Sequence, residues 1–110
     1  MKRAFYCTAL LAISAFFSAS YAQSQTAIRH GREIAQRLCA RCHAIGPEGE
    51  SPHRSAPPFR VIVAKGHPEN LEEALGEGIV VGHPDMPQFQ FSPGDVGALI
   101  AYLKSLSGKG

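Results

Sequence analysis

The sequence contains no tryptophan, no internal repeat and no low-complexity segment, and it has little excess charge. Its 110 residues carry a formal net charge of +2, and two of the positive side chains, Lys2 and Arg3, lie at the very start. The remaining chain is therefore close to neutral. Proteins that bind nucleic acids usually present a clustered basic face, so no nucleic-acid partner is expected. This length favours a single folded domain.

Long apolar runs are also scarce, and the one present lies near the N-terminus. It covers residues 4–17, directly after the two basic residues, and Ser20 and Ala22 then occupy the −3 and −1 positions of a cleavage site. This pattern is typical of a secretory signal peptide. An uncleaved membrane anchor is the alternative, but a span needs about 20 apolar residues. We therefore expect a signal peptide at 1–22, a periplasmic domain at 23–110, and no membrane span in that domain.

Strand patterns are missing as well, whereas helical periodicity is clear. Three segments predict helices separated by loops: residues 27–38, 69–76 and the segment between Ser92 and Gly108. Thr26 is positioned to cap the first helix, Asn70 and Glu73 could form a capping box in the second, and Ser92 is the expected N-cap of the third. The segment 45–59 is rich in proline and glycine and predicts a long loop. The fold class is therefore all-α.

The few cysteines are concentrated in one motif. Outside the predicted signal peptide, the two cysteines are Cys39 and Cys42, and His43 follows the second in the string CARCH. Cys-x-x-Cys-His is the pattern of c-type haem attachment, in which each thiol forms a thioether with the haem and the histidine binds the iron. We therefore predict one haem c, bound covalently through Cys39 and Cys42, with His43 as an axial ligand.

Three other interpretations of the motif remain open. A thioredoxin-like dithiol normally accompanies a βαβ pattern, which this sequence does not show. A structural zinc site needs four ligands, and His53 or His67 would have to complete it. A disulfide between the two cysteines is the third. None of them accounts for the order of all three motif residues as haem attachment does.

Methionine is equally rare, and its position is informative. Met86 is the only methionine besides Met1, and it lies between Pro84 and Pro87. A thioether is a suitable sixth ligand for haem iron, and His/Met ligation raises the reduction potential. We predict Met86 as the second axial ligand. His83 is the competing ligand, and a space-filling role in the core is the alternative for Met86 itself.

On these residues the chain resembles the class I c-type cytochromes, the small bacterial monohaem group, over about residues 27–106. The resemblance implies a cytochrome c-like fold, with three main helices and long loops around one covalent haem. It also implies that Gly31 lets Tyr102 of the last helix pack closely against the first helix. It further implies that a loop carbonyl, assigned to Pro57 with Pro58 or Pro47 as alternatives, accepts a hydrogen bond from His43.

Some features of that family are missing here. There is no tryptophan to bind a haem propionate. Arg60 is our candidate for that role, and an exposed surface arginine is the alternative interpretation. The domain has no ring of lysines for docking, because its lysines are Lys65, Lys104 and Lys109.

The expected function is electron transfer rather than catalysis. Iron ligated by both His43 and Met86 has no open site for a substrate, so the protein would pass single electrons between unidentified redox proteins, as a monomer. A haem protein with a labile sixth ligand that binds a gas or peroxide is one alternative. A haem subunit of a larger dehydrogenase or oxidase complex is another.

Overall fold

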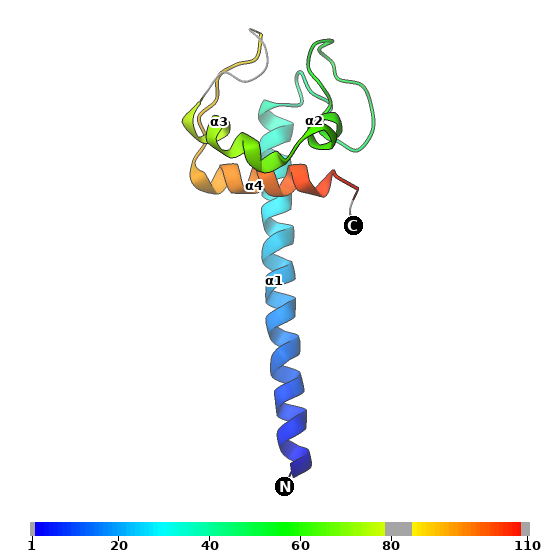
Figure 1. The fold of residues 1–110 in the computed structure, drawn as a ribbon, viewed down its shortest axis with the longest axis vertical. Coiled ribbons are helices and arrows are strands. Elements are labelled where there is room, and N and C mark those ends of the chain that lie inside the picture. Colours follow the sequence, from blue (N-terminus) through cyan, green and yellow to red (C-terminus); the bar gives the residue numbers. More distant parts are fainter. Residues whose placement is uncertain (1, 79–84, 109–110) are drawn as a thin grey trace.

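The computed structural model describes residues 2–78 and 85–108. Its elements, in chain order, are α1 (Lys2–Leu38), α2 (Phe59–Lys65), the 3₁₀ helix η1 (Pro68–Leu71), α3 (Glu72–Glu77) and α4 (Pro93–Ser105). No strand occurs among the described residues, and the predicted all-α class is confirmed. Figure 1 shows α2, η1, α3 and α4 gathered around the C-terminal half of α1.

Helix α1 begins much earlier than the sequence suggested. The predicted start at Ala27, capped by Thr26, is wrong, because the helix is continuous from Lys2. The Thr26 hydroxyl donates a hydrogen bond to the carbonyl of Ala22 at 3.0 Å, the bond of a threonine inside a helix rather than at its start. The N-terminal half of α1 extends away from the other elements (Figure 1). Within the described residues, no helix is both long and apolar enough to cross a membrane.

Helices α1 and α4 cross at Gly31, and their contact is the most extensive one between elements of the fold. A Cβ atom added at Gly31 would collide with the carbonyl oxygen of Ala98 and would lie 2.6 Å from its carbonyl carbon and 2.8 Å from Cβ of Tyr102. The predicted approach of Tyr102 to Gly31 is therefore confirmed, and the backbone at Ala98 approaches more closely still. Glycine weakens a helix, and here it is required because two backbones meet.

A polar contact lies beside the same crossing. Nε2 of His30 on α1 lies 2.7 Å from a carboxylate oxygen of Asp95 on α4. The hydrogen bonds from His30 and from Ser92 lower the pKa of the Asp95 carboxyl. Both groups are partly exposed, so this contact orients the helices more than it stabilises them.

Helix α4 starts where its sequence signals place it. Ser92 is the N-cap and its side-chain oxygen accepts a hydrogen bond from the backbone N–H of Asp95 at 3.2 Å, and Pro93 occupies the first turn. The apolar stripe of α4 packs mainly against α1 and also contacts α3, η1 and α2, and α4 contributes most of the core. The buried core consists of Ile34, Ala35, Phe59, Val63, Val96, Ala98, Leu99, Ile100, Tyr102 and Leu103.

Removal of the Ser92 cap should destabilise the domain. We expect Ser92→Ala to lower the free energy of unfolding by about 1 kcal/mol, the usual effect of losing an N-cap side chain. Urea unfolding of the haem-loaded protein measures this. Ser92→Asn keeps a capping oxygen and should retain most of the stability, so equal losses in the two variants would contradict the capping role.

Helix α2 was not predicted. Residues 45–59 form the expected loop as far as Pro58, but Phe59–Lys65 form a helix. Phe59 and Val63, which are four residues apart, are both buried in the core. Burial of these two side chains stabilises a seven-residue helix whose valines and isoleucine have modest helix propensity.

The predicted helix at 69–76 is divided into two elements. The chain forms η1 after His67 and continues as α3 from Glu72, and no side chain in the described part of the chain caps the start of either element. The predicted capping box of Asn70 and Glu73 is therefore wrong, because Pro68 starts a 3₁₀ turn that includes Asn70. Gly78 ends α3 in the left-handed conformation, with φ of 74°.

Candidate functional site

The two cysteines lie on the turn that follows α1. The amide of Cys39 donates to the carbonyl of Ala35 at 2.8 Å, and the amides of Cys42 and His43 donate to the carbonyl of Cys39 at 3.1 and 2.9 Å. This continued helical turn fixes the spacing between the motif residues. Both cysteines are half-buried.

The His43 ring is held in one orientation by the backbone of Pro57. Its Nδ1 lies 2.7 Å from the Pro57 carbonyl oxygen, and the side chain is 8% exposed. A carbonyl can only accept, so Nδ1 carries the proton and Nε2 keeps a free lone pair. Of the three prolines considered, Pro57 thus makes this contact. Phe59 packs beside the imidazole, with ring centroids 5.4 Å apart.

The loop between His43 and α2 is closed by hydrogen bonds. The amide of Phe59 donates to the carbonyl of Ala44 at 2.9 Å, and the amide of Ala44 donates to the Ser51 hydroxyl at 3.0 Å. Within the loop, the amide of His53 donates to the carbonyl of Cys42 at 3.1 Å. These hydrogen bonds hold the long loop against the motif, so that Pro57, near the end of the loop, lies beside His43.

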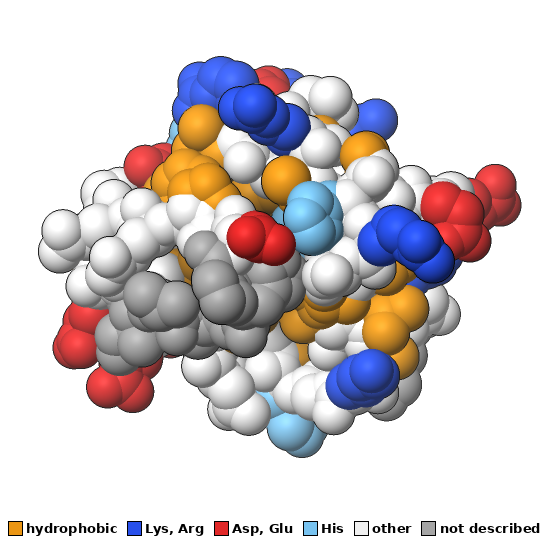
Figure 2. Space-filling view, turned by 90° about the horizontal axis from the view of Figure 1, so that it is seen from above, with side chains coloured by type: hydrophobic (Ala, Val, Ile, Leu, Met, Phe, Trp, Pro, Cys, Tyr) orange, Lys and Arg blue, Asp and Glu red, His pale blue; other side chains and the backbone are white. Residues whose placement is uncertain are grey.

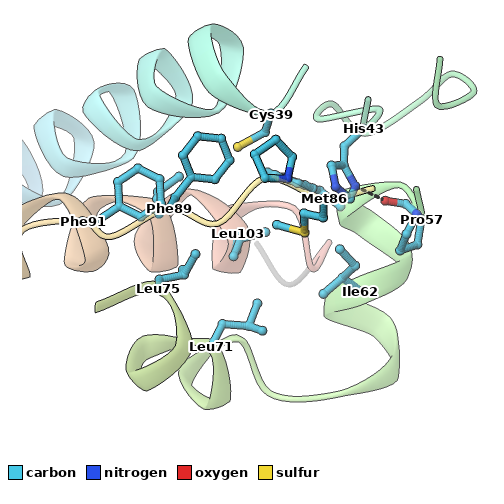
Figure 3. A pocket seen from close by; sticks show the side chains of 13 residues that line it. Cys39, His43, Pro57, Ile62, Leu71, Leu75, Met86, Phe89, Phe91 and Leu103 are labelled. Carbon is cyan, nitrogen blue, oxygen red and sulfur yellow. Dashed lines mark hydrogen bonds between the residues drawn. The ribbon is translucent and has the colours of Figure 1, made fainter. Parts of the chain in front are cut away.

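A largely apolar cavity of about 260 Å³ lies next to His43. Figure 3 shows its lining side chains, which come from the turn after α1, the loop before α2, α2, the η1–α3 segment, the segment before α4, and α4. They are Cys39, His43, Pro57, Phe59, Ile62, Leu71, Leu75, Met86, Pro87, Phe89, Phe91, Leu99 and Leu103. The cavity thus gathers four of the five predicted site residues.

The chemistry of this lining fits a haem. The walls are aliphatic and aromatic, as a flat apolar macrocycle requires. His43 offers an unprotonated Nε2, and Met86 offers a thioether, which are known axial ligands of haem iron. Cys39 places a thiol on the wall. The residues present therefore suit this group.

The state of Cys39 argues against a redox dithiol. Burial, with a smaller contribution from Cys42, raises the pKa of the Cys39 thiol to about 11. Reactive Cys-x-x-Cys pairs instead have a cysteine whose pKa is lowered. At neutral pH, Cys39 is a protonated apolar thiol rather than a nucleophilic thiolate.

Other predicted residues lie elsewhere. Cys42 is half-buried on the turn after α1 and is not part of the cavity lining. His83, the competing ligand, lies outside the described residues. His53 and His67 do not line the cavity. Among the described residues, no cluster of three or more His, Cys, Asp or Glu side chains could hold a metal ion.

Arg60 differs from an ordinary surface arginine. It is half-buried on α2, and its Nη1 atom is buried without a hydrogen-bond partner in the part of the chain that the structure describes. A buried guanidinium nitrogen without an acceptor is costly. Arg60 therefore has an unused donor, and it directly follows the cavity-lining residue Phe59 in the sequence.

Sequence reasoning missed several lining residues and one hydrogen bond. Ile62 and Leu71 belong to helical turns that were not correctly predicted, and Phe89 and Phe91 have alternating positions that gave no helical signal. The Tyr102 hydroxyl donates to the carbonyl of Ile45 at 2.8 Å. No local pattern could reveal that bond, because 57 residues separate its partners.

Two comparisons with known proteins match the chain. The family model described as "Cytochrome C oxidase, cbb3-type, subunit III" matches residues 26–103. Cytochrome c-552 of Bradyrhizobium diazoefficiens is 31% identical over 77 residues, which cover 70% of this chain and 72% of that protein. No solved structure matches the chain. The family match covers well over half of the chain and includes the motif, the loop and most of α4. The chain therefore belongs to this family and is a small c-type cytochrome, a haem-based electron-transfer protein.

Proposed function

We propose that residues 23–110 carry one electron at a time on a single haem c. In this proposal Cys39 and Cys42 attach the haem, and His43 and Met86 are its axial ligands. The protein is an electron carrier and not an enzyme, since two axial side chains leave no open position for a substrate.

One observation carries the proposal. His43 and Met86, which are far apart in sequence, line the same apolar cavity together with Cys39 (Figure 3). A methionine that merely filled the core would have no reason to share this cavity with an oriented imidazole and a thiol.

The side chains tune the site by orientation and by excluding water. When bound, the haem supplies a one-electron Fe(III)/Fe(II) couple. The Pro57 carbonyl holds the Nδ1 proton of His43, which fixes the ring and increases the basicity of Nε2. The aromatic and aliphatic lining keeps the site dry, and a low dielectric disfavours added charge there. The neutral thioether of Met86 adds no charge to the site.

We assign Arg60 to a haem propionate. The support is its buried Nη1, which has no hydrogen-bond partner among the described residues. Arg60 directly follows Phe59, which lines the cavity, while Arg60 itself lines a separate hollow with Glu69 and Lys104. A carboxylate would provide the missing acceptor through a charge-assisted hydrogen bond.

The proposed setting is the periplasm, reached through a signal peptide at 1–22 that is then removed. In support, the N-terminal half of α1 projects away from the other elements (Figure 1), and Ser20 and Ala22 are exposed. Removal of 1–22 leaves the half of α1 that contacts α4.

The partners are a redox donor and a redox acceptor, and the protein acts as a monomer between them. Figure 2 views the molecule from the end that carries the loops, and acidic and basic side chains both appear on that face. Such a mixed surface lacks the strong single-sign field that steers many charged partners. We therefore expect association that depends weakly on salt.

A second candidate function comes from the family description, which names a subunit of an oxidase. The chain would then deliver electrons within a larger complex. The native size of the exported protein distinguishes the two, because a free carrier elutes as a monomer and a subunit elutes with its complex.

The test combines intact mass with visible spectra. We expect the denatured exported protein to have the mass of residues 23–110 plus one haem. We also expect a low-spin spectrum, with the weak far-red band of methionine–iron ligation, that carbon monoxide does not change. A carbon monoxide-sensitive or high-spin spectrum would support the gas- or peroxide-binding alternative. A mass without haem would refute the proposal.

A further inference from the structure

The Tyr102 side chain does more than pack against Gly31. It is 6% exposed, and its hydroxyl donates a hydrogen bond of 2.8 Å to the carbonyl of Ile45. The ring alone would satisfy the contact with Gly31, and phenylalanine could supply it. The hydroxyl therefore has a separate role, and that role is at the start of the loop that follows His43.

Three consecutive residues are fixed at this point by three different partners. The His43 ring is bound by the Pro57 carbonyl, the Ala44 carbonyl accepts from the amide of Phe59, and the Ile45 carbonyl accepts from Tyr102. Pro57 belongs to the end of the loop, and Phe59 is the first residue of α2. Tyr102 is the partner that connects the segment to α4, the helix with the most buried residues.

We propose that Tyr102 is a positioning residue for His43, because its hydroxyl anchors the loop whose far end supplies the Pro57 carbonyl. The inference rests on the proposed function, in which His43 is an iron ligand. Through this anchor, the α1–α4 crossing is connected to the orientation of the imidazole. Burial raises the pKa of the Tyr102 phenol, so the hydroxyl remains a donor at neutral pH.

The direction of the effect follows from the hydrogen bond at Nδ1. This bond strengthens the donation of Nε2 and stabilises the more positive oxidised iron. Without the anchor, the Ile45 carbonyl is left partly buried and unpaired, and the start of the loop moves to find water. The Pro57 carbonyl then holds His43 less tightly, and the reduction potential rises.

The experiment compares Tyr102→Phe with the parent, both loaded with haem. We expect the His43 Nδ1 proton to exchange with solvent about fivefold faster in the variant, the factor equivalent to one hydrogen bond, and the potential to shift upward. Because the ring is retained, contact with Gly31 is preserved. A purely structural role for the hydroxyl would lower stability and leave the potential unchanged.

The matched control is Ser107→Ala, which removes another hydroxyl hydrogen bond, the one to the carbonyl of Lys104. Exchange at His43 and the potential should not change in this control. Unchanged exchange and potential in Tyr102→Phe would overturn the inference while the ligand assignment stands. If the parent itself lacks the low-spin spectrum of histidine–iron ligation, the proposed function fails and the inference with it.

Discussion

In Met86→Ala, we expect the far-red methionine–iron band to disappear, carbon monoxide to bind the reduced protein, and the reduction potential to fall. The variant loses the thioether that we assign to the sixth position, and water or another weak ligand replaces it. Axial ligands adjust haem potentials over about 0.8 V, so a fall on the order of 0.1 V is expected. Spectra and potentiometry of the haem-loaded variant measure these changes.

The matched control for this prediction is Gln90→Ala. Gln90 is an exposed residue four positions further along the same segment, and its removal should preserve the band and the potential. The ligand assignment to Met86 is refuted if Met86→Ala has the parent spectrum. His83 would then be the first residue to test as the ligand.

The second large effect concerns stability. In Gly31→Ala, the added Cβ would collide with the carbonyl of Ala98 and lie 2.8 Å from Cβ of Tyr102. The neighbouring atoms are the backbone carbonyl of Ala98 and Cβ of Tyr102, which cannot rotate away from the added Cβ. The two helices must therefore move apart. Overpacking typically costs 1–3 kcal/mol, occasionally more. Because backbone is involved, we expect a loss of about 3 kcal/mol, and a larger loss for Gly31→Leu.

Helix propensity acts in the opposite direction and supplies the control. Alanine is favoured over glycine by about 1 kcal/mol inside a helix. Gly97 lies inside α4, and a Cβ added there would have no neighbour within 4 Å among the described residues. Gly97→Ala should therefore stabilise the haem-loaded protein by about 0.5–1 kcal/mol, as measured by urea unfolding. If Gly31→Ala were also stabilising, the close crossing of α1 and α4 would be wrong.

Local signals predicted α4 correctly, and the resemblance to the class I c-type cytochromes implied the contact of Tyr102 with Gly31 at the helix crossing. Ser92, Pro93 and Asp95 are short-range signals that act at the helix start itself, so the sequence contains all the information needed. Gly31 was informative for a different reason. A glycine inside an otherwise good helix is unfavourable locally, which agrees with the long-range contact that the resemblance implied for Gly31.

The errors occur where tertiary contacts determine local structure. Helix α2 exists because Phe59 and Val63 are buried together, and its seven residues are too few to show a period. Thr26 has a capping residue's chemistry, yet the residues before it are also helical. In the candidate site, the residues in the motif were evident from their spacing, whereas Ile62 and Leu71 are part of the cavity only because the helices that carry them pack there.

The crossing of the first and last helices also determines when the domain can fold. Its partners are distant in the chain, since 65 residues separate His30 from Asp95. Closing so long a loop costs entropy that only the complete set of contacts offsets, and such non-local contacts slow folding. In the export from the N-terminus that we propose, Cys39 and Cys42 would emerge well before α4. Both thiols would then lie in an open, accessible chain until the last helix has crossed.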